Sequence, residues 1–364
     1  MDKLQAKLPG QVVLVLQGGG ALGAYQVGVY QALHEAGIEP DWVIGTSIGA
    51  VNGAVIAGNR AEERFPRLCE LWERFSHGNA FAFDQHNVFA DFSALLWGIP
   101  GFFAPRLPAW GGLQAKVGLE AASYYSTAPL RETLAQLVDS GILGKQIRLT
   151  VGAVNVKSGT MRYFDSRDAA LGLDEVMASG ALPPGFPAIR VDGEAYWDGG
   201  LYSNTPLEAV LDDSPRRDSV IFAVNVWQPT GHEPESLWQV MARQKDIQYA
   251  SRADSHIARQ KQIHRLRHVI RELTKNLPSE KQDECRELAS WGCATTMHVV
   301  RLLAPALEGE DFTKDLDFSA AGTRFRREAG HADTRRMLER APWEAAVDPM
   351  EGVIVHELSA RTGG

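Results

Sequence analysis

The chain has few cysteines, no long apolar run and no excess of basic charge, and each of these absences excludes a class of protein. Its 364 residues include only Cys69, Cys285 and Cys293, none in a CxxC spacing, so neither a disulfide framework nor a metal site is expected and a reducing compartment fits best. The formal net charge of -8 argues against a nucleic-acid partner, because phosphate groups would be repelled.

Two uncharged stretches near the N-terminus, residues 8–33 and 42–59, are too polar to span a membrane. The first includes three consecutive glycines and several glutamines, whereas a spanning helix needs about 20 predominantly apolar residues. Its apolar run Val12–Leu16 is also too short for the hydrophobic region of a signal peptide. We therefore expect a cytoplasmic protein.

Buried strands that alternate with helices predict an α/β fold. Residues 12–16 are a β-branched apolar run without alternation, which is typical of a strand covered on both faces. A glycine-rich turn and a helical pattern follow, and residues 42–56 repeat the same order. This βαβα opening indicates a mostly parallel, doubly wound sheet. Further strands are expected at residues 146–156, 161–165, 196–198, 219–226 and 297–303.

An aromatic-rich segment, residues 72–125, interrupts this alternation. Its rings are Trp72, Phe75, Phe81, Phe83, Phe89, Phe92, Trp97, Phe102, Phe103 and Trp110. Two interpretations stay open: an insertion that packs its rings on the sheet, with leftover surface buried in a homo-oligomer, or a lid or apolar channel for an acyl chain.

Beyond residue 235 the sequence becomes polar and helical, which predicts an α-rich extension over residues 235–364 after a main domain at residues 10–230. The expected strand at 297–303 could join the main sheet. Within the extension, residues 243–275 hold nine basic and three acidic residues with an apolar stripe. Such a helix could lie on an anionic membrane, or it could pack on the protein with a solvated charged face.

The first glycine motif, Gly18-Gly19-Gly20-Ala21-Leu22-Gly23, matches the GxGxxG pattern of dinucleotide-binding turns. A Rossmann unit also needs an acidic residue about 20 positions on, at the end of the second strand. Here that strand ends in Gly45-Thr46-Ser47, and Asp41 lies at its beginning. Dinucleotide binding is therefore a lesser alternative.

The second motif, Gly45-Thr46-Ser47-Ile48-Gly49, has the GxSxG pattern of a nucleophile elbow, which makes Ser47 the candidate nucleophile. The helix that begins at Ile48 directs free N–H groups toward the serine oxygen, where a negative charge would develop. The glycine loop at residues 18–20 should close on the same edge of the sheet and offer further backbone donors.

A nucleophilic serine needs a base, and histidine is the usual one. None of the ten histidines lies at a strand end or between glycines. Asp198 is the better candidate, because the sequence Trp197-Asp198-Gly199-Gly200 places it directly after a short expected strand, where glycines allow close approach.

Together, GGGALG, GTSIG and DGG resemble the patatin-like phospholipases over about residues 10–230. Residues 178–187, ASGALPPGFP, are similar to the proline-bearing block that precedes the catalytic aspartate of that family. The resemblance implies a three-layer α/β/α fold, a Ser47–Asp198 dyad and no cofactor. It also implies an oxyanion hole built from backbone N–H groups of Gly18, Gly19, Gly20 and Ile48, with Gly23, Gly45, Gly49, Gly199 and Gly200 supporting the motifs.

One position departs from the family pattern, since many members carry Arg or Lys where this chain has Leu22. The expected function is hydrolysis of lipid carboxylic esters through an acyl-enzyme, and the substrate could be a phospholipid, a glyceride, a thioester or a polyester. The alternative from another class is a non-catalytic lipid-binding or assembly protein. Peripheral membrane contact through the basic stretch at 243–275 is an open alternative to its packing on the protein.

Overall fold

A computed structural model describes residues 8–76, 96–106, 116–250, 253–307, 310–348 and 350–358. Its core is one sheet with the strand order β11-β10-β9-β1-β2-β5-β8-β7, and β6 also pairs with β5. The strands are β1 (Gln11–Leu16), β2 (Trp42–Gly45), β5 (Arg148–Asn155), β6 (Met161–Asp165), β7 (Ile189–Val191), β8 (Glu194–Asp198), β9 (Ser219–Asn225), β10 (Met297–Leu303) and β11 (Val353–Glu357). From β11 to β5 all neighbours are parallel, whereas β6, β7 and β8 pair antiparallel. The predicted mostly parallel α/β sheet is confirmed.

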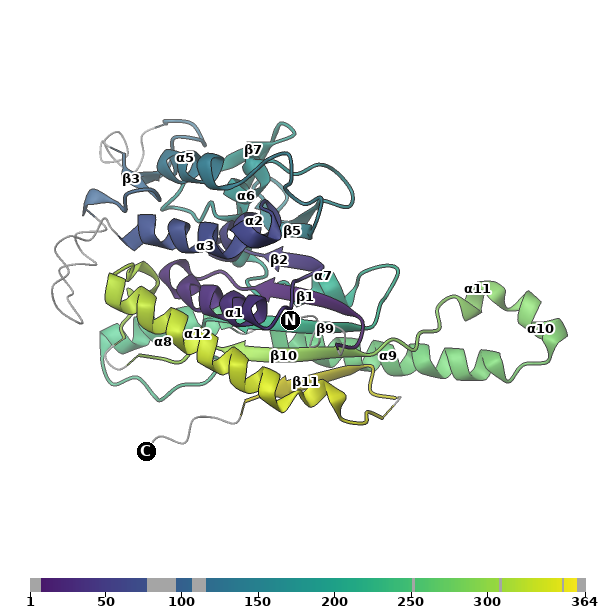
Figure 1. Cartoon of the computed structure of the whole chain (residues 1–364). Coiled ribbons are helices and arrows are strands. Elements are labelled where there is room, and N and C mark those ends of the chain that lie inside the picture. The colour runs from purple at the N-terminus through teal and green to yellow at the C-terminus, as the bar shows by residue number, and fades with distance from the viewer. Residues whose placement is uncertain are drawn as a thin grey trace.

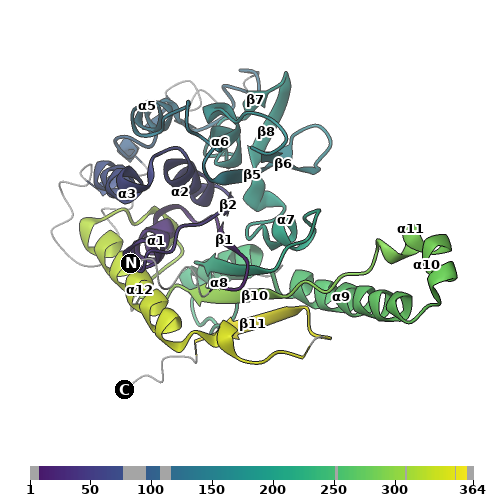
Figure 2. The same cartoon turned by 45° about the vertical axis from the view of Figure 1, so that its right-hand side comes forward.

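Helices cover both faces of this sheet, as Figure 2 shows. Successive residues of β1 are buried on opposite faces, Leu14 in one apolar cluster and Val15 in the other, which explains the unbroken apolar run. The first face, on which Leu14 lies, carries α1 (Ala24–Glu35), α2 (Ile48–Ala57), α3 (Ala61–Ser76), α5 (Ala128–Leu137), α6 (Leu173–Ser179) and α12 (Ala320–Arg340). The second face, on which Val15 lies, carries α7 (Leu207–Leu211) and α9 (Ala253–Lys275). The arrangement is the expected three-layer fold.

The C-terminal extension belongs to the same sheet and the same core. The expected strand at 297–303 is β10, which lies parallel between β9 and β11. Helix α12 packs along α1 on the first face (Figure 1). The sheet continues across the predicted division between residues 230 and 235, and the division into two domains stays a prediction. No helix in the described part of the chain is long and apolar enough to cross a bilayer.

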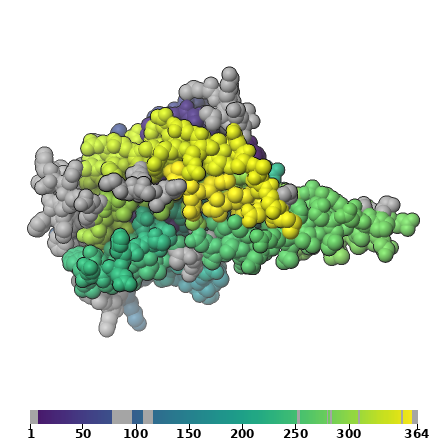
Figure 3. All heavy atoms as spheres, turned by 90° about the horizontal axis from the view of Figure 1, so that it is seen from below, coloured from purple at the N-terminus to yellow at the C-terminus, as the bar shows by residue number. Residues whose placement is uncertain are grey.

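One part of the extension leaves the body of the protein. The far half of α9, with α10 (Ser279–Glu284) and α11 (Arg286–Ala289), forms a projecting arm, seen in green in Figures 1 and 3. Helix α8 (Leu237–Ala250) instead lies against the body, at the end opposite the arm. The basic stretch at 243–275 is thus divided between two helices in different places.

The described rings of the aromatic segment are mostly core residues. Phe75, Phe102 and Phe318 form a mutually packed group with centroid distances of 5.0 to 5.8 Å, and Trp72 and Phe103 are buried beside it. Phe318 comes from the extension, so both parts of the chain complete this cluster. Trp97 is 80% exposed. Phe81, Phe83, Phe89, Phe92 and Trp110 lie outside the described residues, and the channel hypothesis for them stays a prediction.

Arg326 joins α12 to the loop that precedes it in the extension. The side chain is 2% exposed, and its guanidinium donates to Asp317 at 3.0 Å and to Glu310 at 3.1 Å. The same loop carries η5 (Lys314–Leu316), which packs on η2 (Gly20–Gly23) next to the glycine motif. A buried charge of this kind is stabilising only while its partners remain in place.

Replacement of Arg326 by methionine should therefore destabilise the protein by about 3 to 5 kcal/mol, because two carboxylates lose their buried partner. The matched control is Arg324→Met on the exposed side of the same helix, which should cost less than about 0.5 kcal/mol. Urea unfolding followed by far-UV circular dichroism measures both. Equal stability of the two variants would contradict the role of Arg326.

Candidate active site

The two motifs near the N-terminus meet at the carboxyl edge of the sheet. Strands β1 and β2 are parallel neighbours with Leu16 opposite Gly45, so the turns that follow them lie side by side. The glycine loop therefore approaches the turn that carries Ser47. A Cβ added to Gly18 would lie 2.9 Å from the Ser47 Cβ, which shows how close the two turns are.

Ser47 occupies the strained turn that the GxSxG pattern predicts. Its backbone has φ 56° and ψ -125°, a conformation that non-glycine residues rarely adopt. The flanking glycines are required by close packing, since a Cβ on Gly45 would lie 2.4 Å from the Gly49 carbonyl oxygen, and one on Gly49 would lie 2.2 Å from that of Leu16. The turn holds the serine side chain between strand and helix.

Asp198 lies at the end of β8, and the structure brings it together with Ser47. The carboxyl group is almost fully buried, at 2% exposure, and this burial raises the pKa of Asp198 to about 7. Hydrogen bonds from the Ser47 side chain and from the Gly200 N–H, the latter 2.7 Å long, act in the opposite direction. A carboxylate whose pKa is near neutrality can accept a proton from a nucleophile at physiological pH.

Ser179 is a site residue that the sequence argument missed. Its hydroxyl donates to the Gly152 carbonyl at 2.6 Å and accepts from the Ser47 N–H at 3.1 Å. The contact fixes the Ser47 backbone from the side of β5. Ser179 lies in the ASGALPPGFP block, so the block identified the segment but not the role of this hydroxyl.

The expected oxyanion donors need one correction. The Gly18 N–H donates to the Asn204 carbonyl at 3.2 Å and is not free for a substrate, so its assignment as a donor is wrong. Within the described part of the chain, the N–H groups of Gly19, Gly20 and Ile48 have no such partner. These three remain candidate donors beside Ser47.

Buried amide side chains hold the glycine loop in place. The Gln17 side chain accepts from the N–H groups of Val226 and Trp227, at 2.5 and 3.1 Å, and donates to the Thr205 hydroxyl at 2.7 Å. Asn204 donates to the Gly18 carbonyl at 3.0 Å. A polar residue directly after a buried strand, as Gln17 is, was the available sequence signal for this role.

The extension reaches the site through α8 and the η5 loop. The Tyr249 carbonyl accepts from Gln17 at 3.1 Å and from Asn204 at 3.4 Å. Burial, together with the nearby charge of Asp198, raises the pKa of the Tyr249 hydroxyl to about 12. On the other side of the loop, a Cβ on Gly20 would lie 2.2 Å from the Asp315 carbonyl oxygen. The site is therefore built from both parts of the chain.

The alternatives that need a histidine or a nucleotide gain no support from the geometry. His34, His256 and His331 pair with glutamates outside the site, and burial, Ser47 and Gly200 account for the pKa of Asp198. Asp41 accepts the Val12 N–H at 2.8 Å, at the amino end of the strands. It therefore cannot hold a ribose beside the glycine loop.

Comparison with known families gives two matches. A family model described as patatin-like phospholipase matches residues 14–211, more than half of the chain and including Ser47 and Asp198. A second family model, described as patatin phospholipase, matches residues 247–350 in the extension.

Similar individual proteins share shorter regions. Lysophospholipase nte1 of Aspergillus terreus is 47% identical over 79 residues, which cover 19% of this chain and 5% of that protein. Patatin-like phospholipase domain-containing protein 6 of Mus musculus is 44% identical over 63 residues, or 17% and 5%. The chain thus matches about one twentieth of the length of these curated relatives. The crystal structure of VipD from Legionella pneumophila aligns with a TM-score of 0.39 at 15% identity, over 91% of this chain and 67% of that one.

The raised pKa of Asp198 should make the folded protein less stable at pH values above the pKa that this carboxyl group has in the unfolded chain. Below about pH 4 the carboxyl is protonated in both states; between about pH 4 and 7 only the unfolded state ionises, so the free energy of unfolding falls as pH rises. Asp198→Asn removes this effect. The variant should be about 2 to 4 kcal/mol more stable than wild type at about pH 8, and equal near pH 4.

Urea unfolding of both proteins across this pH range measures the difference. The control is Asp192→Asn in the exposed turn before β8, which should change the free energy of unfolding by less than about 0.5 kcal/mol. A stability gain for Asp198→Asn that does not depend on pH would count against a raised pKa.

Proposed function

The chain belongs to the patatin-like phospholipase family, and on that premise we propose that it is a serine hydrolase of lipid carboxylic esters, with Ser47 as nucleophile and Asp198 as base. The observation that carries the proposal is the meeting of a strained serine turn with a buried carboxyl group whose pKa is near 7. Strain at such a position persists only where the surrounding structure holds it, and it is concentrated at functional sites.

The reaction would proceed through an acyl-enzyme. The Ser47 oxygen attacks the ester carbonyl while Asp198 takes its proton, and the same proton then passes to the departing alcohol. Asp198 next accepts a proton from water, whose oxygen attacks the acyl carbonyl; the bond to the Ser47 oxygen then breaks, that oxygen takes the proton back from Asp198, and the fatty acid leaves. The N–H groups of Gly19, Gly20 and Ile48 would stabilise the oxyanion at both steps.

Leu22 bears on which lipids are accepted. Its side chain is buried. Because leucine is neutral, the glycine loop places no positive charge at that position beside the oxyanion. Backbone donors can stabilise an oxyanion without a cation, and ester hydrolysis does not require one. A preference for a phosphate headgroup would have to come from another residue.

A fluorophosphonate probe should label wild-type protein at Ser47, because it reacts with activated serines and mimics the tetrahedral intermediate. Ser47→Ala should abolish labelling. Ser158→Ala, in the exposed turn between β5 and β6, should leave it unchanged. Gel fluorescence with peptide mapping reads the site, and labelling that survives Ser47→Ala would disprove the assignment.

Asp198→Asn should lower kcat on a soluble p-nitrophenyl ester by at least about 100-fold, since it removes the base and little volume. The wild-type kcat/KM should rise about tenfold per pH unit up to about pH 7 and then level off, because only ionised Asp198 can accept the proton. Each of the ten histidines should be replaceable with substantial activity retained. A folded histidine variant as inactive as Ser47→Ala would refute the dyad.

A further inference from the structure

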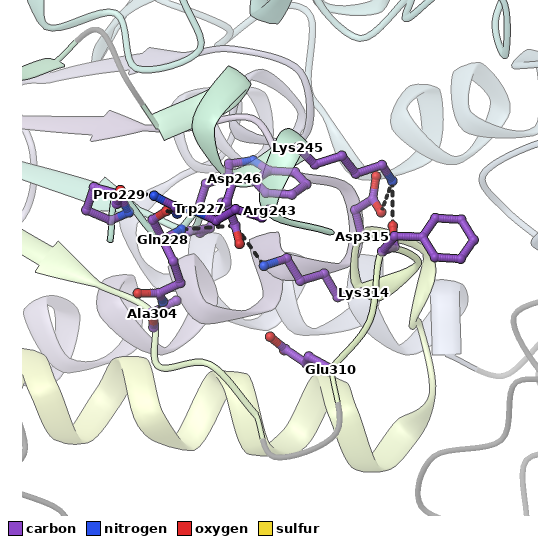
Figure 4. Close-up of polar contacts among 12 residues, drawn as sticks. Trp227, Gln228, Pro229, Arg243, Lys245, Asp246, Ala304, Glu310, Lys314 and Asp315 are labelled. Carbon is purple, nitrogen blue, oxygen red and sulfur yellow. Dashed lines mark hydrogen bonds and ion pairs between the residues drawn. The ribbon is translucent and has the colours of Figure 1, made fainter. Parts of the chain in front are cut away.

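Helix α8 carries its charges toward the protein and not toward the solvent. Arg243 donates to the Gln228 and Pro229 carbonyls, at 3.1 and 2.9 Å. Lys245 pairs with Asp315 at 2.7 Å, and Asp246 pairs with buried Lys314 at 2.8 Å. Figure 4 shows these side chains facing inward among the ends of the strands and the η5 loop.

The outward side of α8 carries large apolar residues and glutamines but no charge. We call its large exposed apolar residues, which are 40% to 74% exposed, the α8 face: Leu237, Trp238, Val240, Met241 and Ile247. The other exposed positions of the helix are Gln239, Gln244 and Gln248. Surface helices normally have the opposite arrangement, and an apolar patch of this kind marks a contact with something apolar.

The end of α8, next to Ile247 of the α8 face, borders the candidate active site. Gln248 and Tyr249, at the end of the helix, line a small pocket with Gly200 and Tyr202 from the turn that follows Asp198. Leu201 and Tyr202 in that turn are also exposed. The end of α8 and two exposed apolar residues of the turn that follows Asp198 therefore lie around the same pocket.

The projecting arm lies at the other edge of the sheet. Helix α9 begins near the carboxyl end of β10, where Asp254 pairs with Arg301. Further along, the Arg267 carbonyl accepts the Cys293 N–H just before β10 begins. The arm beyond Arg267 thus extends away from the amino edge, opposite to Ser47. An arm resting on a membrane would hold the dyad away from it.

We propose that the α8 face docks the protein on a zwitterionic phospholipid surface and brings the dyad to its substrate there. This proposal rests on the proposed function, since it supplies the route by which an aggregated lipid reaches Ser47. The absence of charge on the face suits a neutral surface, where burial of apolar side chains is the attraction. Trp238, half exposed and packed on Phe312, is the residue type that favours a membrane interface.

The test compares two matched double variants. Val240→Gln with Ile247→Gln changes two residues of the α8 face that are two helical turns apart. Leu266→Gln with Leu273→Gln changes two residues of α9, at the same spacing and each 66% exposed. Glutamine favours helix and adds no charge, so both variants should fold, and circular dichroism and melting curves check this.

Binding is measured by co-flotation with phosphatidylcholine vesicles, with Ser47→Ala in every protein so that the lipid stays intact. The α8 variant should bind at least about tenfold more weakly, and the α9 variant should stay within about twofold of the parent protein. With Ser47 restored, the α8 variant should lose at least about tenfold in kcat/KM on vesicles and be unchanged on soluble p-nitrophenyl butyrate.

The outcomes separate docking from catalysis. If the parent binds vesicles through α8 but wild type hydrolyses neither substrate, docking stands and the proposed function fails. The docking proposal is overturned if the α8 variant binds phosphatidylcholine vesicles like the parent. It is also overturned if the parent binds only vesicles that contain an anionic lipid and the α9 variant alone loses that binding. It is also overturned if gel filtration shows a wild-type dimer that the α8 variant dissociates without any change in vesicle binding, because a second copy is then the occupant.

Discussion

The backbone of Gly18 is the point on which the candidate site depends, because three hydrogen bonds with two distant segments hold it at once. Its N–H donates to Asn204, and its carbonyl accepts from Asn204 at 3.0 Å and from the Trp227 indole at 2.7 Å. Asn204 follows the turn of Asp198, and Trp227 follows β9. These hydrogen bonds set the candidate donors of Gly19 and Gly20 relative to both Ser47 and Asp198. In a buried setting each of them would be costly to lose.

The extension is a structural part of this arrangement. Phe318 completes the aromatic cluster, η5 lies against the glycine loop, and Tyr249 receives two of the amide hydrogen bonds at the site. The buried pair of Lys314 and Asp246 ties α8 to the same loop. A change in composition near residue 235 therefore marks a change in surface character, while the core and the site continue across it.

The ion pairs and hydrogen bonds that the charged residues of α8 make with the body of the protein fix which side of this helix faces the solvent. Because Arg243, Lys245 and Asp246 all find partners on the protein, the helix has no charged side chain left for its outer side, which apolar residues and glutamines occupy. Composition alone assigned this stretch to a basic helix. Its ion pairs come from residues about 70 positions further on, so sequence periodicity could not show which side faces the solvent.

The sequence by itself determined the class of fold, the succession of strands and helices in the opening βαβα unit, and the two residues of the candidate dyad. Each of these follows from local rules: an apolar run without alternation for β1, and small residues around Ser47 and Asp198 where chains approach closely. Only the tertiary structure decided that Gly18 is engaged and Ser179 supports Ser47, and that α8 and the projecting arm lie at opposite edges of the sheet. Those outcomes depend on hydrogen bonds and packing between segments far apart in the chain, which no local pattern records.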